Sequence, residues 1–350
     1  MKAALYAEFQ GPITIEQVPD PTPPVGGVVV EVRASGICRS DWHGWQGHDG
    51  DITALPHVPG HELAGEVVAV DRAVRDWQVG DRVTVPFCLG CGDCEPCRAG
   101  QQQVCDHDEQ PGFTMWGALA EYVALPYADT NLVRVPDALD YADVASLGCR
   151  FVTAHRAVTA QGQVSVGEWV AVYGCGGVGL SAVMIAQAAG AQVIAVDINP
   201  AALTLAAQLG ALHTVNAAEM DAAAVVEAVR DLSGGGVHLS LDALGSSITC
   251  RNSILSLRKQ GRHVQVGLLA GEHTDPPLPM GAVVGRELAL YGSHGMQAHA
   301  YPALLSMVER GAVNPGALVT RRLHLSDAPA IFAQMSTYDT VGINLVDRFD

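Results

Sequence analysis

The chain has 350 residues, of which 49% are hydrophobic and 16% are charged. At about 150 residues per domain this length predicts two domains, and so apolar a composition excludes an intrinsically disordered chain. The 20 basic and 37 acidic side chains give a net charge of −17, which argues against nucleic acid or an anionic membrane as a partner. We therefore expect a folded, two-domain protein that binds neither.

The first 150 residues have the pattern of a loop-rich, mainly antiparallel β domain. Residues 28–34 and 63–70 are β-branched runs bounded by Gly and Pro, which predicts strands. Residues 79–83 predict a turn that leads into a further strand. At the start of the chain, Glu8 interrupts the apolar residues before a signal-peptide core can form, so we expect a cytoplasmic protein.

Two segments of the predicted β domain carry candidate metal ligands. They read Cys38-Arg39-Ser40-Asp41-Trp42-His43 and Gly60-His61-Glu62, and Cys149 follows much later. A catalytic zinc ion takes three protein ligands and keeps one position open, and two Cys with one His form a known set. Each residue alone is more often a core or surface residue, so the prediction rests on their combination.

Four more cysteines fall in one short segment, at positions 91, 94, 97 and 105. The two-residue gaps let successive thiolates turn towards one ion, and four thiolates complete a tetrahedral structural zinc site. An iron–sulfur cluster is the alternative, but the bacterial ferredoxin run has a last gap of three residues and a following Pro. Here the last gap is seven and Asp106 follows, which favours zinc.

After about residue 150 the pattern changes to an alternation of strands and helices. Strands are predicted at 169–173, 192–196, 237–241 and 263–266, and Ala-rich helices at 178–189 and 200–209. Such alternation predicts a parallel, doubly wound sheet. The uncharged stretch 169–196 is long enough to span a bilayer, but its glycines divide it into strand, turn, helix and strand. Beyond about 290 we expect a helix near 301–310 and a closing strand at 343–346.

A glycine-rich turn joins the first of these strands to its helix. It reads Gly174-Cys175-Gly176-Gly177-Val178-Gly179. In this context the glycines permit a tight turn and a close backbone approach to a pyrophosphate, to which the helix N-terminus offers N–H groups. The motif therefore predicts a dinucleotide site.

Asp197 ends the next strand, 18 residues after Gly179. An acid at this place accepts hydrogen bonds from a ribose 2′-OH and repels a 2′-phosphate, and no Lys or Arg lies between 198 and 229. These features favour NAD over NADP. Asp197 also has a structural interpretation, as an acidic cap on the helix that starts near Pro200, and both roles can hold together.

These motifs together resemble the zinc-dependent medium-chain alcohol dehydrogenases over essentially the whole chain. Five motifs carry the resemblance in the same order: the segment from Cys38 to His43, Gly60-His61-Glu62, the four-cysteine lobe, residues 148–154 and the turn 174–179. The resemblance implies an α/β protein with a GroES-like, mainly-β catalytic domain and a Rossmann coenzyme domain with a doubly wound parallel sheet. The expected boundaries are 1–150 for the catalytic domain with its zinc lobe at about 88–106, 151–290 for the coenzyme domain, and 291–350 for the return to the catalytic domain.

The resemblance also implies roles at the metal. Cys38, His61 and Cys149 would hold the catalytic zinc, and Cys91, Cys94, Cys97 and Cys105 the structural zinc, giving two ions per chain. Asp41 would hydrogen-bond His61 and fix its ring. Glu62 would lie just behind the metal and could ligate it transiently. In polyol-type relatives this Glu is a true ligand and the late Cys is missing. Because Cys149 is present here, Glu62 ranks behind it as a ligand.

Further implied roles concern the proton and the cofactor. Ser40 and His43 resemble a proton relay that takes the alcohol proton out of a buried pocket. Arg39 would meet the pyrophosphate, and Thr153, Val266 and Leu268 would lie near the nicotinamide. One departure is the segment Gly342-Ile343-Asn344, where relatives often carry a basic residue that contacts the cofactor.

Trp45, Phe87 and Trp116 match positions that line the substrate pocket in relatives, with Leu268 as a further candidate. Plain core packing is the alternative for these aromatic residues. An apolar wall suits primary or secondary alcohols, and the corresponding aldehydes or ketones, better than sugars. Polyols or other special alcohols remain alternative substrates, and a zinc-stabilised dinucleotide sensor without turnover is the alternative from another class. The resemblance also implies a homo-oligomer, with a tetramer favoured over a dimer.

Overall fold

The computed structural model describes residues 1–269, 273–337 and 341–350. The chain divides into two compact units, Met1–Val152 with Gly295–Asp350 as unit 1, and Thr153–His294 as unit 2. The changes of unit therefore lie two and four residues beyond the positions 150 and 290 expected from the sequence. Within the described part of the chain, no helix combines the length and apolarity needed to cross a bilayer.

Unit 1 is built on a sheet of seven strands. The sheet runs β14-β15-β3-β4-β5-β7, with β6 paired to β3, and every pairing except β14 with β15 is antiparallel. A separate antiparallel pair, β1 with β2, lies outside it. The strands of unit 1 are β1 Lys2–Leu5, β2 Thr14–Gln17, β3 Val28–Ile37, β4 Glu62–Val70, β5 Arg82–Thr84, β6 Tyr122–Leu125, β7 Val133–Arg134, β14 Val319–His324 and β15 Ile343–Arg348.

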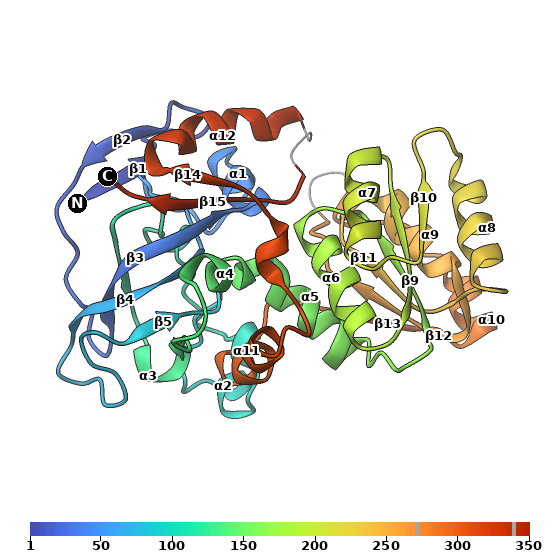
Figure 1. Cartoon of the computed structure of the whole chain (residues 1–350), viewed down its shortest axis with the longest axis horizontal. Coiled ribbons are helices and arrows are strands. Elements are labelled where there is room, and N and C mark those ends of the chain that lie inside the picture. The colour runs from blue at the N-terminus through green and yellow to red at the C-terminus, as the bar shows by residue number, and fades with distance from the viewer. Residues whose placement is uncertain (270–272, 338–340) are drawn as a thin grey trace. The chain divides into compact units, whose positions relative to one another are not determined.

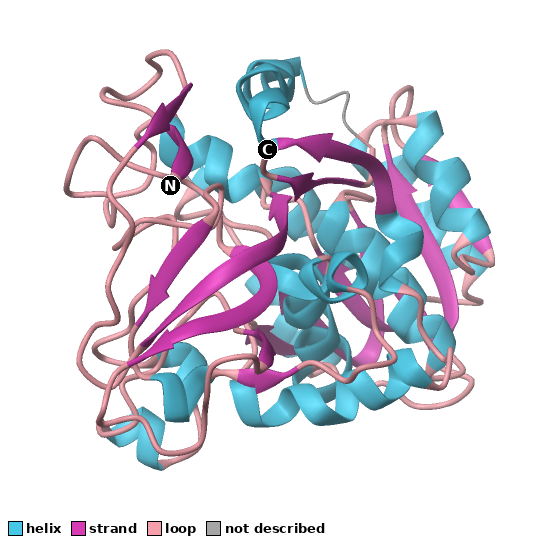
Figure 2. Cartoon of the chain, turned by 60° about the vertical axis from the view of Figure 1, so that its left-hand side comes forward, coloured by secondary structure: helices cyan, strands magenta, loops and turns pink. Residues whose placement is uncertain are grey.

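Short helices and loops join these strands (Figure 2). Apolar clusters fill the interior of unit 1: one around Tyr6, Trp42 and Phe332, one around Val30, Leu63 and Leu125, and a smaller one around Leu5, Val58 and Ala120. The helices assigned to this unit are α1 Arg39–Trp45, α2 Glu95–Arg98, η1 Gln102–Val104, α3 Ala128–Asn131, α4 Tyr141–Ala145, η2 Leu147–Phe151, η5 Ala298–Ala300, α11 Tyr301–Glu309, η6 Pro315–Leu318, η7 Leu325–Asp327, α12 Ala328–Gln334 and η8 Met335–Thr337.

Unit 2 is a six-stranded, wholly parallel sheet in the order β10-β9-β8-β11-β12-β13. The strand order reverses between β8 and β11, and helices lie on both faces of the sheet (Figure 1). The elements are α5 Val152–Arg156, η3 Ala157–Gln161, β8 Trp169–Tyr173, α6 Gly177–Ala188, β9 Gln192–Asp197, α7 Pro200–Gln208, β10 His213–Asn216, α8 Ala222–Leu232, β11 Val237–Asp242, α9 Ser247–Leu255, β12 Leu257–Gln265, α10 Met280–Arg286 and β13 Ala289–Gly292.

The fold class predicted from the sequence is confirmed: a mainly antiparallel unit is combined with a doubly wound parallel sheet. The uncharged stretch 169–196 forms β8, α6 and part of β9, as its glycines indicated. In unit 2, β12 begins at Leu257, well before the predicted 263, and the short polar strand β10 was not predicted. The strand β13 and the helices α8, α9 and α10 were not predicted either.

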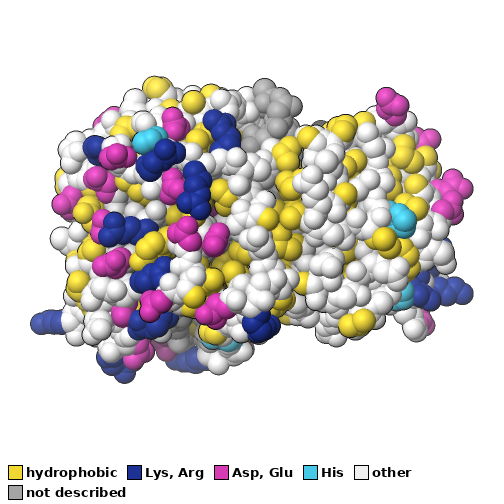
Figure 3. Space-filling model, viewed as in Figure 1, with side chains coloured by type: hydrophobic (Ala, Val, Ile, Leu, Met, Phe, Trp, Pro, Cys, Tyr) yellow, Lys and Arg dark blue, Asp and Glu magenta, His cyan; other side chains and the backbone are white. Residues whose placement is uncertain are grey.

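The surface of unit 1 mixes charges of both signs. On the face drawn in Figure 3, Lys and Arg side chains lie among Asp and Glu side chains. Arg322, for example, pairs with Asp140 and Asp347, and Arg33 pairs with Glu31. This face therefore offers no continuous basic surface of the kind that binds nucleic acid.

Candidate active site and metal centres

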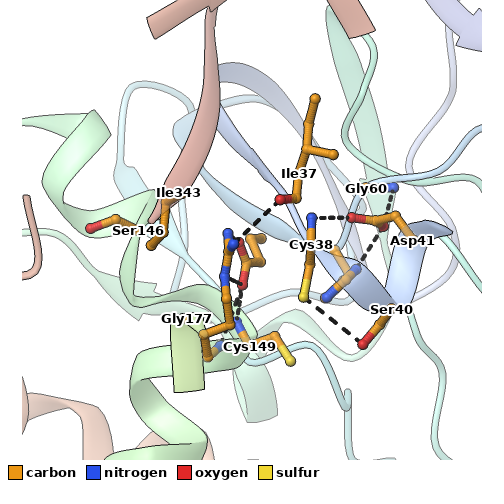
Figure 4. Close-up of polar contacts among 12 residues, drawn as sticks. Ile37, Cys38, Ser40, Asp41, Gly60, Ser146, Cys149, Gly177 and Ile343 are labelled. Atoms are coloured by element: carbon orange, nitrogen blue, oxygen red, sulfur yellow. Dashed lines mark hydrogen bonds and ion pairs between the residues drawn. The ribbon is translucent and has the colours of Figure 1, made fainter. Parts of the chain in front are cut away.

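Three loops of unit 1 bring together one His, two Cys and one Glu. Cys38 follows β3 directly, His61 and Glu62 stand at the start of β4, and Cys149 lies in η2. Their ligand atoms all lie within 4.8 Å of one another. Cys38, His61 and Glu62 are buried, and Figure 4 shows the Cys38 and Cys149 side chains near each other.

The His61 ring has one nitrogen fixed and the other without a partner. Nδ1 lies 2.8 Å from Oδ1 of Asp41. Nε2 is buried and makes no hydrogen bond within the described ranges. An orphaned imidazole nitrogen beside two thiols is the donor set that zinc prefers, so these residues fit a zinc ion.

Charges within this cluster shift the ionisation of its members. A hydrogen bond from Cys149 lowers the pKa of Cys38 well below its ordinary value. Burial alone would lower the pKa of His61, but Asp41 and Cys38 together raise it well above its ordinary value. The cluster therefore favours a thiolate at Cys38, the form that ligates metals.

Asp41 organises two of the ligand-bearing loops. Its Oδ1 accepts the Gly60 N–H at 3.0 Å as well as facing His61, and its Oδ2 accepts the Cys38 N–H at 2.8 Å. The carboxylate is buried, and both of its oxygens are satisfied. One side chain thus sets the orientation of His61 and the position of Cys38. Figure 4 shows Asp41 bonded to Cys38 and Gly60.

Glu62 is held by Arg150, a residue to which the sequence analysis gave no role of its own. Glu62 Oε1 accepts the Arg150 Nε–H at 2.9 Å and the Cys149 N–H at 3.1 Å, and Oε2 accepts from Nη2. Arg150 Nη1 also donates to the Ile37 carbonyl at 3.3 Å. Burial would lower the pKa of Arg150, but the Glu62 carboxylate raises it. The only signal in the sequence was an Arg within an apolar run.

Two glycines make room for this carboxylate. A Cβ atom at Gly36 would lie 2.1 Å from Glu62 Oε2, and one at Gly148 would lie 2.4 Å from Glu62 Cβ. Asn344, in the segment where relatives often carry a basic residue, lies opposite Ile37 in the β15–β3 pairing and is buried. Asn344 therefore carries no charge at this position, and the nearby buried cation Arg150 is paired with Glu62.

The second metal-type cluster contains the four cysteines of the predicted lobe. The thiols of Cys91, Cys94, Cys97 and Cys105 lie within 4.8 Å of one another. Backbone N–H groups point at the sulfurs, from Cys91 to Cys105 at 3.3 Å and from Cys94 to Cys91 at 3.4 Å. Such N–H donors, including that of Asp106, outweigh burial and lower the pKa of Cys94 to about 7. Four inward thiols leave no open position, which suits a structural ion.

Helix α1 carries Arg39, Ser40 and His43 beside the first cluster. Ser40 Oγ lies 3.9 Å from Cys38 Sγ, and the Arg39 guanidinium donates to the Met335 carbonyl. His43 is half-buried, and burial, with smaller effects of His48 and Arg39, lowers its pKa. The ring of His43 therefore stays neutral to lower pH than the ring of an ordinary histidine.

The aromatic residues predicted for the pocket occupy different places. The Phe87 ring lies 6.1 Å from the His61 ring, and Phe113, which the sequence analysis missed, lies 5.2 Å from it. Trp45 packs edge-on against Phe332 in the core cluster, and its Nε1 donates to Gly11. Trp116 is exposed, so core packing is the wrong interpretation for it.

The glycine turn of unit 2 has the conformation that its sequence requires. Gly174 has φ of +88°, and Gly176 is the N-cap of α6. A Cβ atom at Gly179 would lie 1.7 Å from the Gly174 carbonyl oxygen, so only glycine fits there. The helix begins at Gly177, with Val178 in its first turn, and its free N–H groups face the end of β8.

Asp197 ends β9 beside this turn. Its Oδ2 accepts the Cys175 N–H at 2.5 Å, and its Oδ1 accepts the Asn199 N–H at 2.8 Å. The interpretation of Asp197 as the cap of the next helix is wrong. Asn199 caps α7, because its Oδ1 accepts the N–H of Ala201, and a cap must directly precede the first helical residue.

Exposed apolar side chains gather at the carboxyl ends of the parallel strands. Ile198 follows β9, Leu244 and Ile248 follow β11, and Leu268 follows β12; all four are more than half exposed. Val266 is half-buried, and Thr153 is buried at the start of unit 2. Ligands of doubly wound sheets bind outside this edge, near the point where the strand order reverses. Of these, the sequence analysis missed Ile198, Leu244 and Ile248.

The Glu62–Arg150 pair should dominate the stability of unit 1. Arg150→Met leaves a buried carboxylate without its counterion and should lower the free energy of unfolding by about 3–5 kcal/mol. The double variant Glu62→Gln/Arg150→Met should recover most of this loss, whereas Arg98→Met, in an exposed pair with Asp93, should cost about 1 kcal/mol or less. Urea unfolding measures all three, and an Arg150→Met variant as stable as the parent would contradict the argument.

Comparisons with known proteins agree with this geometry. Residues 24–137 match the alcohol dehydrogenase GroES-like domain, and residues 177–310 match the zinc-binding dehydrogenase domain. An alcohol dehydrogenase of Geobacillus stearothermophilus is 34% identical over 336 residues, covering 96% of this chain and 95% of the relative. An L-threonine 3-dehydrogenase of Streptomyces coelicolor is 32% identical, covering 96% of both chains.

Among solved structures, the alcohol dehydrogenase TADH from Thermus sp. ATN1 superposes with a TM-score of 0.90 at 31% identity, covering 99% of both chains. The two domain families and their order are those of the two units described above. The matches thus span both the metal clusters and the glycine turn. The chain belongs to the zinc-type alcohol dehydrogenases of the medium-chain dehydrogenase/reductase superfamily.

Proposed function

We propose that the protein is a zinc- and NAD-dependent dehydrogenase that interconverts primary or secondary alcohols and their aldehydes or ketones. The observation that carries the proposal is the open donor set of Cys38, His61 and Cys149 with Ser40 beside it. A dinucleotide sensor without turnover would need neither an open metal position nor a hydroxyl next to it. The enzyme is therefore the better interpretation.

Three residues of this chain would hold the catalytic zinc, namely Cys38, His61 and Cys149. A zinc ion bound there acts as a Lewis acid and lowers the pKa of the substrate hydroxyl. Asp41 keeps the His61 ring turned so that Nε2 faces the thiols. Glu62 is engaged on both oxygens, so we place it behind the ligand set and outside it.

The alcohol proton must leave a buried site before or together with hydride transfer. Ser40 lies next to Cys38 and would hold this proton, and His43 lies one helical turn further along α1. The neutral ring of His43 then accepts the proton and carries it towards solvent. Phe87 and Phe113, which lie against His61, give the pocket the apolar wall that suits alcohols without many hydroxyl groups.

The cofactor would be bound mainly by unit 2. The turn from Gly174 to Gly179 and the N-terminus of α6 would hold the pyrophosphate, and Asp197 the adenosine ribose. NAD, when bound, accepts the hydride. Residues proposed to contact it elsewhere are Arg39, Thr153, Val266 and Leu268.

A panel of alcohols tests the proposal directly. Purified protein is mixed with NAD and each alcohol, including L-threonine and polyols, and NADH absorbance is followed while bound metal is measured. We expect the fastest turnover with primary or secondary alcohols that have apolar tails. Faster turnover of polyols or of L-threonine would contradict the proposed substrate class. If no alcohol gave NADH, the proposal that the protein is a dehydrogenase would be wrong.

We further propose a cytoplasmic homo-oligomer, a tetramer rather than a dimer. The edge strand β13 of the parallel sheet has one side without a partner strand in the described chain. Tyr291 on this strand and Val284 on α10 are exposed. Such an edge supports association with a second copy of the chain. Sedimentation analysis measures the mass of the assembly, and we expect the mass of four chains.

Two zinc ions per chain are expected from the separate three-ligand and four-ligand sets. Cys149→Ser should remove one ion and abolish turnover while the fold is retained, because the remaining donors no longer complete the site. Cys94→Ser should remove the other ion and lower the unfolding temperature, because the lobe loses its cross-link. Elemental analysis and thermal unfolding measure both effects, and one ion or none in the parent would contradict the assignment.

NAD should be preferred to NADP because of Asp197. Asp197→Ala should lower the ratio of kcat/KM with NAD to kcat/KM with NADP by about tenfold or more. The reason is that a carboxylate next to the 2′-phosphate of NADP costs several kcal/mol, and the variant removes this repulsion. Asp197→Asn is the companion variant, because it removes the charge but keeps one of the two oxygens that accept the Cys175 and Asn199 N–H groups. The kcat/KM values with both cofactors decide, and a parent that prefers NADP would contradict this role.

His43→Gln should slow alcohol oxidation most at low pH, where solvent base is scarce. The pKa of His43 lies below its ordinary value, so the parent ring remains a base there and the variant has none. General acid–base catalysis contributes about 10²–10⁴-fold, and we expect the low end or less because water replaces part of the relay. Small amine bases should restore part of the rate.

Ser40→Ala should slow the reaction more than His43→Gln does. Water does not easily replace a hydroxyl held beside the metal ligand Cys38. The pH profiles of kcat for the parent and both variants measure the effect. If all three profiles coincide, these residues do not form a relay.

A further inference from the structure

Helix α1 ends in a turn that folds the next segment back onto it. The Gly47 N–H donates to the Gly44 carbonyl at 2.9 Å, and the His48 N–H donates to the His43 carbonyl at 3.0 Å. Gly47 has φ of +78°, the left-handed conformation that this helix ending requires. The ending places the side chain of His48 over that of His43.

The two imidazole rings are in hydrogen-bond contact. Nδ1 of His43 lies 3.1 Å from Nδ1 of His48, and the ring centroids are 5.4 Å apart. Trp42, which is buried, presents its ring edge-on to both, at 5.0 Å from His43 and 6.1 Å from His48. The contact is thus supported by a fixed neighbour and by the helix ending.

A bond between two Nδ1 atoms constrains where the protons lie. One ring must donate and the other must accept, so the pair cannot carry two protonated rings in this geometry. When His43 is the donor, its Nε2 has a free lone pair that faces away from His48. His48 is the more exposed of the two and has its own Nε2 available to solvent.

Burial and nearby charges act on His43 in both senses. Burial, His48 and Arg39 lower the pKa of its ring, whereas the Cys38 sulfur and Asp49, which follows His48 in the chain, raise it. The direction of proton movement is set by exposure, because His48 is exposed to solvent and His43 is half-buried.

We infer that His48 is the outer member of a two-imidazole relay and acts through His43. A proton arriving at Nε2 of His43 is matched by transfer of the Nδ1 proton of His43 to Nδ1 of His48. His48, then protonated, releases its Nε2 proton to water, and a reversal of the tautomers restores the pair. The inference rests on the proposed dehydrogenase function and assigns a positioning residue to it.

Kinetics of His48→Gln test the relay. Glutamine still accepts a hydrogen bond from His43 but does not take up and release a proton, so oxidation at low pH should slow by about threefold to tenfold and converge with the parent at high pH. Added imidazole should restore part of the rate. His299→Gln, which changes an exposed histidine of the same unit, should match the parent. His43→Gln/His48→Gln should be no slower than His43→Gln, because both changes interrupt one path.

Long-range ¹H–¹⁵N NMR of the histidine rings in the full chain gives an independent readout. We expect one of the two rings as the Nδ1–H form, and an increase of the His43 pKa in His48→Gln because a neighbouring positive charge is removed. Two Nε2–H rings would contradict the relay.

Two kinetic outcomes separate the relay from the proposed function. An active parent whose pH profile is unchanged in His48→Gln would contradict the relay alone. A parent that oxidises no alcohol would contradict the proposed function, and the relay with it.

Discussion

The buried ion pair between Glu62 and Arg150 is the constraint on which the catalytic cluster depends. It joins the end of β3 through Ile37, the start of β4 through Glu62, and η2 through Cys149. Each of these segments carries one ligand of the proposed catalytic zinc. A buried charge without its partner costs several kcal/mol, so folding can complete only when the three segments meet. The geometry of the metal site is thus fixed before any metal binds.

The two cysteine-containing clusters have similar donor atoms but differ in how far apart these donors lie in the sequence. In the lobe, the ligands come from 15 consecutive residues, from Cys91 to Cys105, and local turns aim four thiols at one point. In the proposed catalytic cluster, residues up to 111 positions apart are brought together, from Cys38 to Cys149, and the three proposed ligands would leave one position open. A closed local site suits a cross-link, whereas an open site built by the tertiary fold suits catalysis.

Helix α1 carries groups of both the proposed metal site and the proposed proton relay. Its first turn holds Ser40 next to Cys38, and its last turn holds His43, which is half-buried. Asp41 on the same helix fixes the proposed metal ligand His61, and the helix ending brings His48 onto His43. Because one short helix positions all of these groups, small changes in its packing should affect metal binding and proton release together.

The sequence by itself determined the features whose cause is local. The spacing of the four lobe cysteines, the glycines of the 174–179 turn and the alternation of strands and helices each follow from neighbouring residues, and they were predicted. Only the tertiary structure decided what depends on distant segments: the pairing of Glu62 with Arg150 across 88 residues, and the packing of Phe113 on His61. Local spacing restricts backbone conformation, but a buried contact between distant residues exists only once the whole chain has folded.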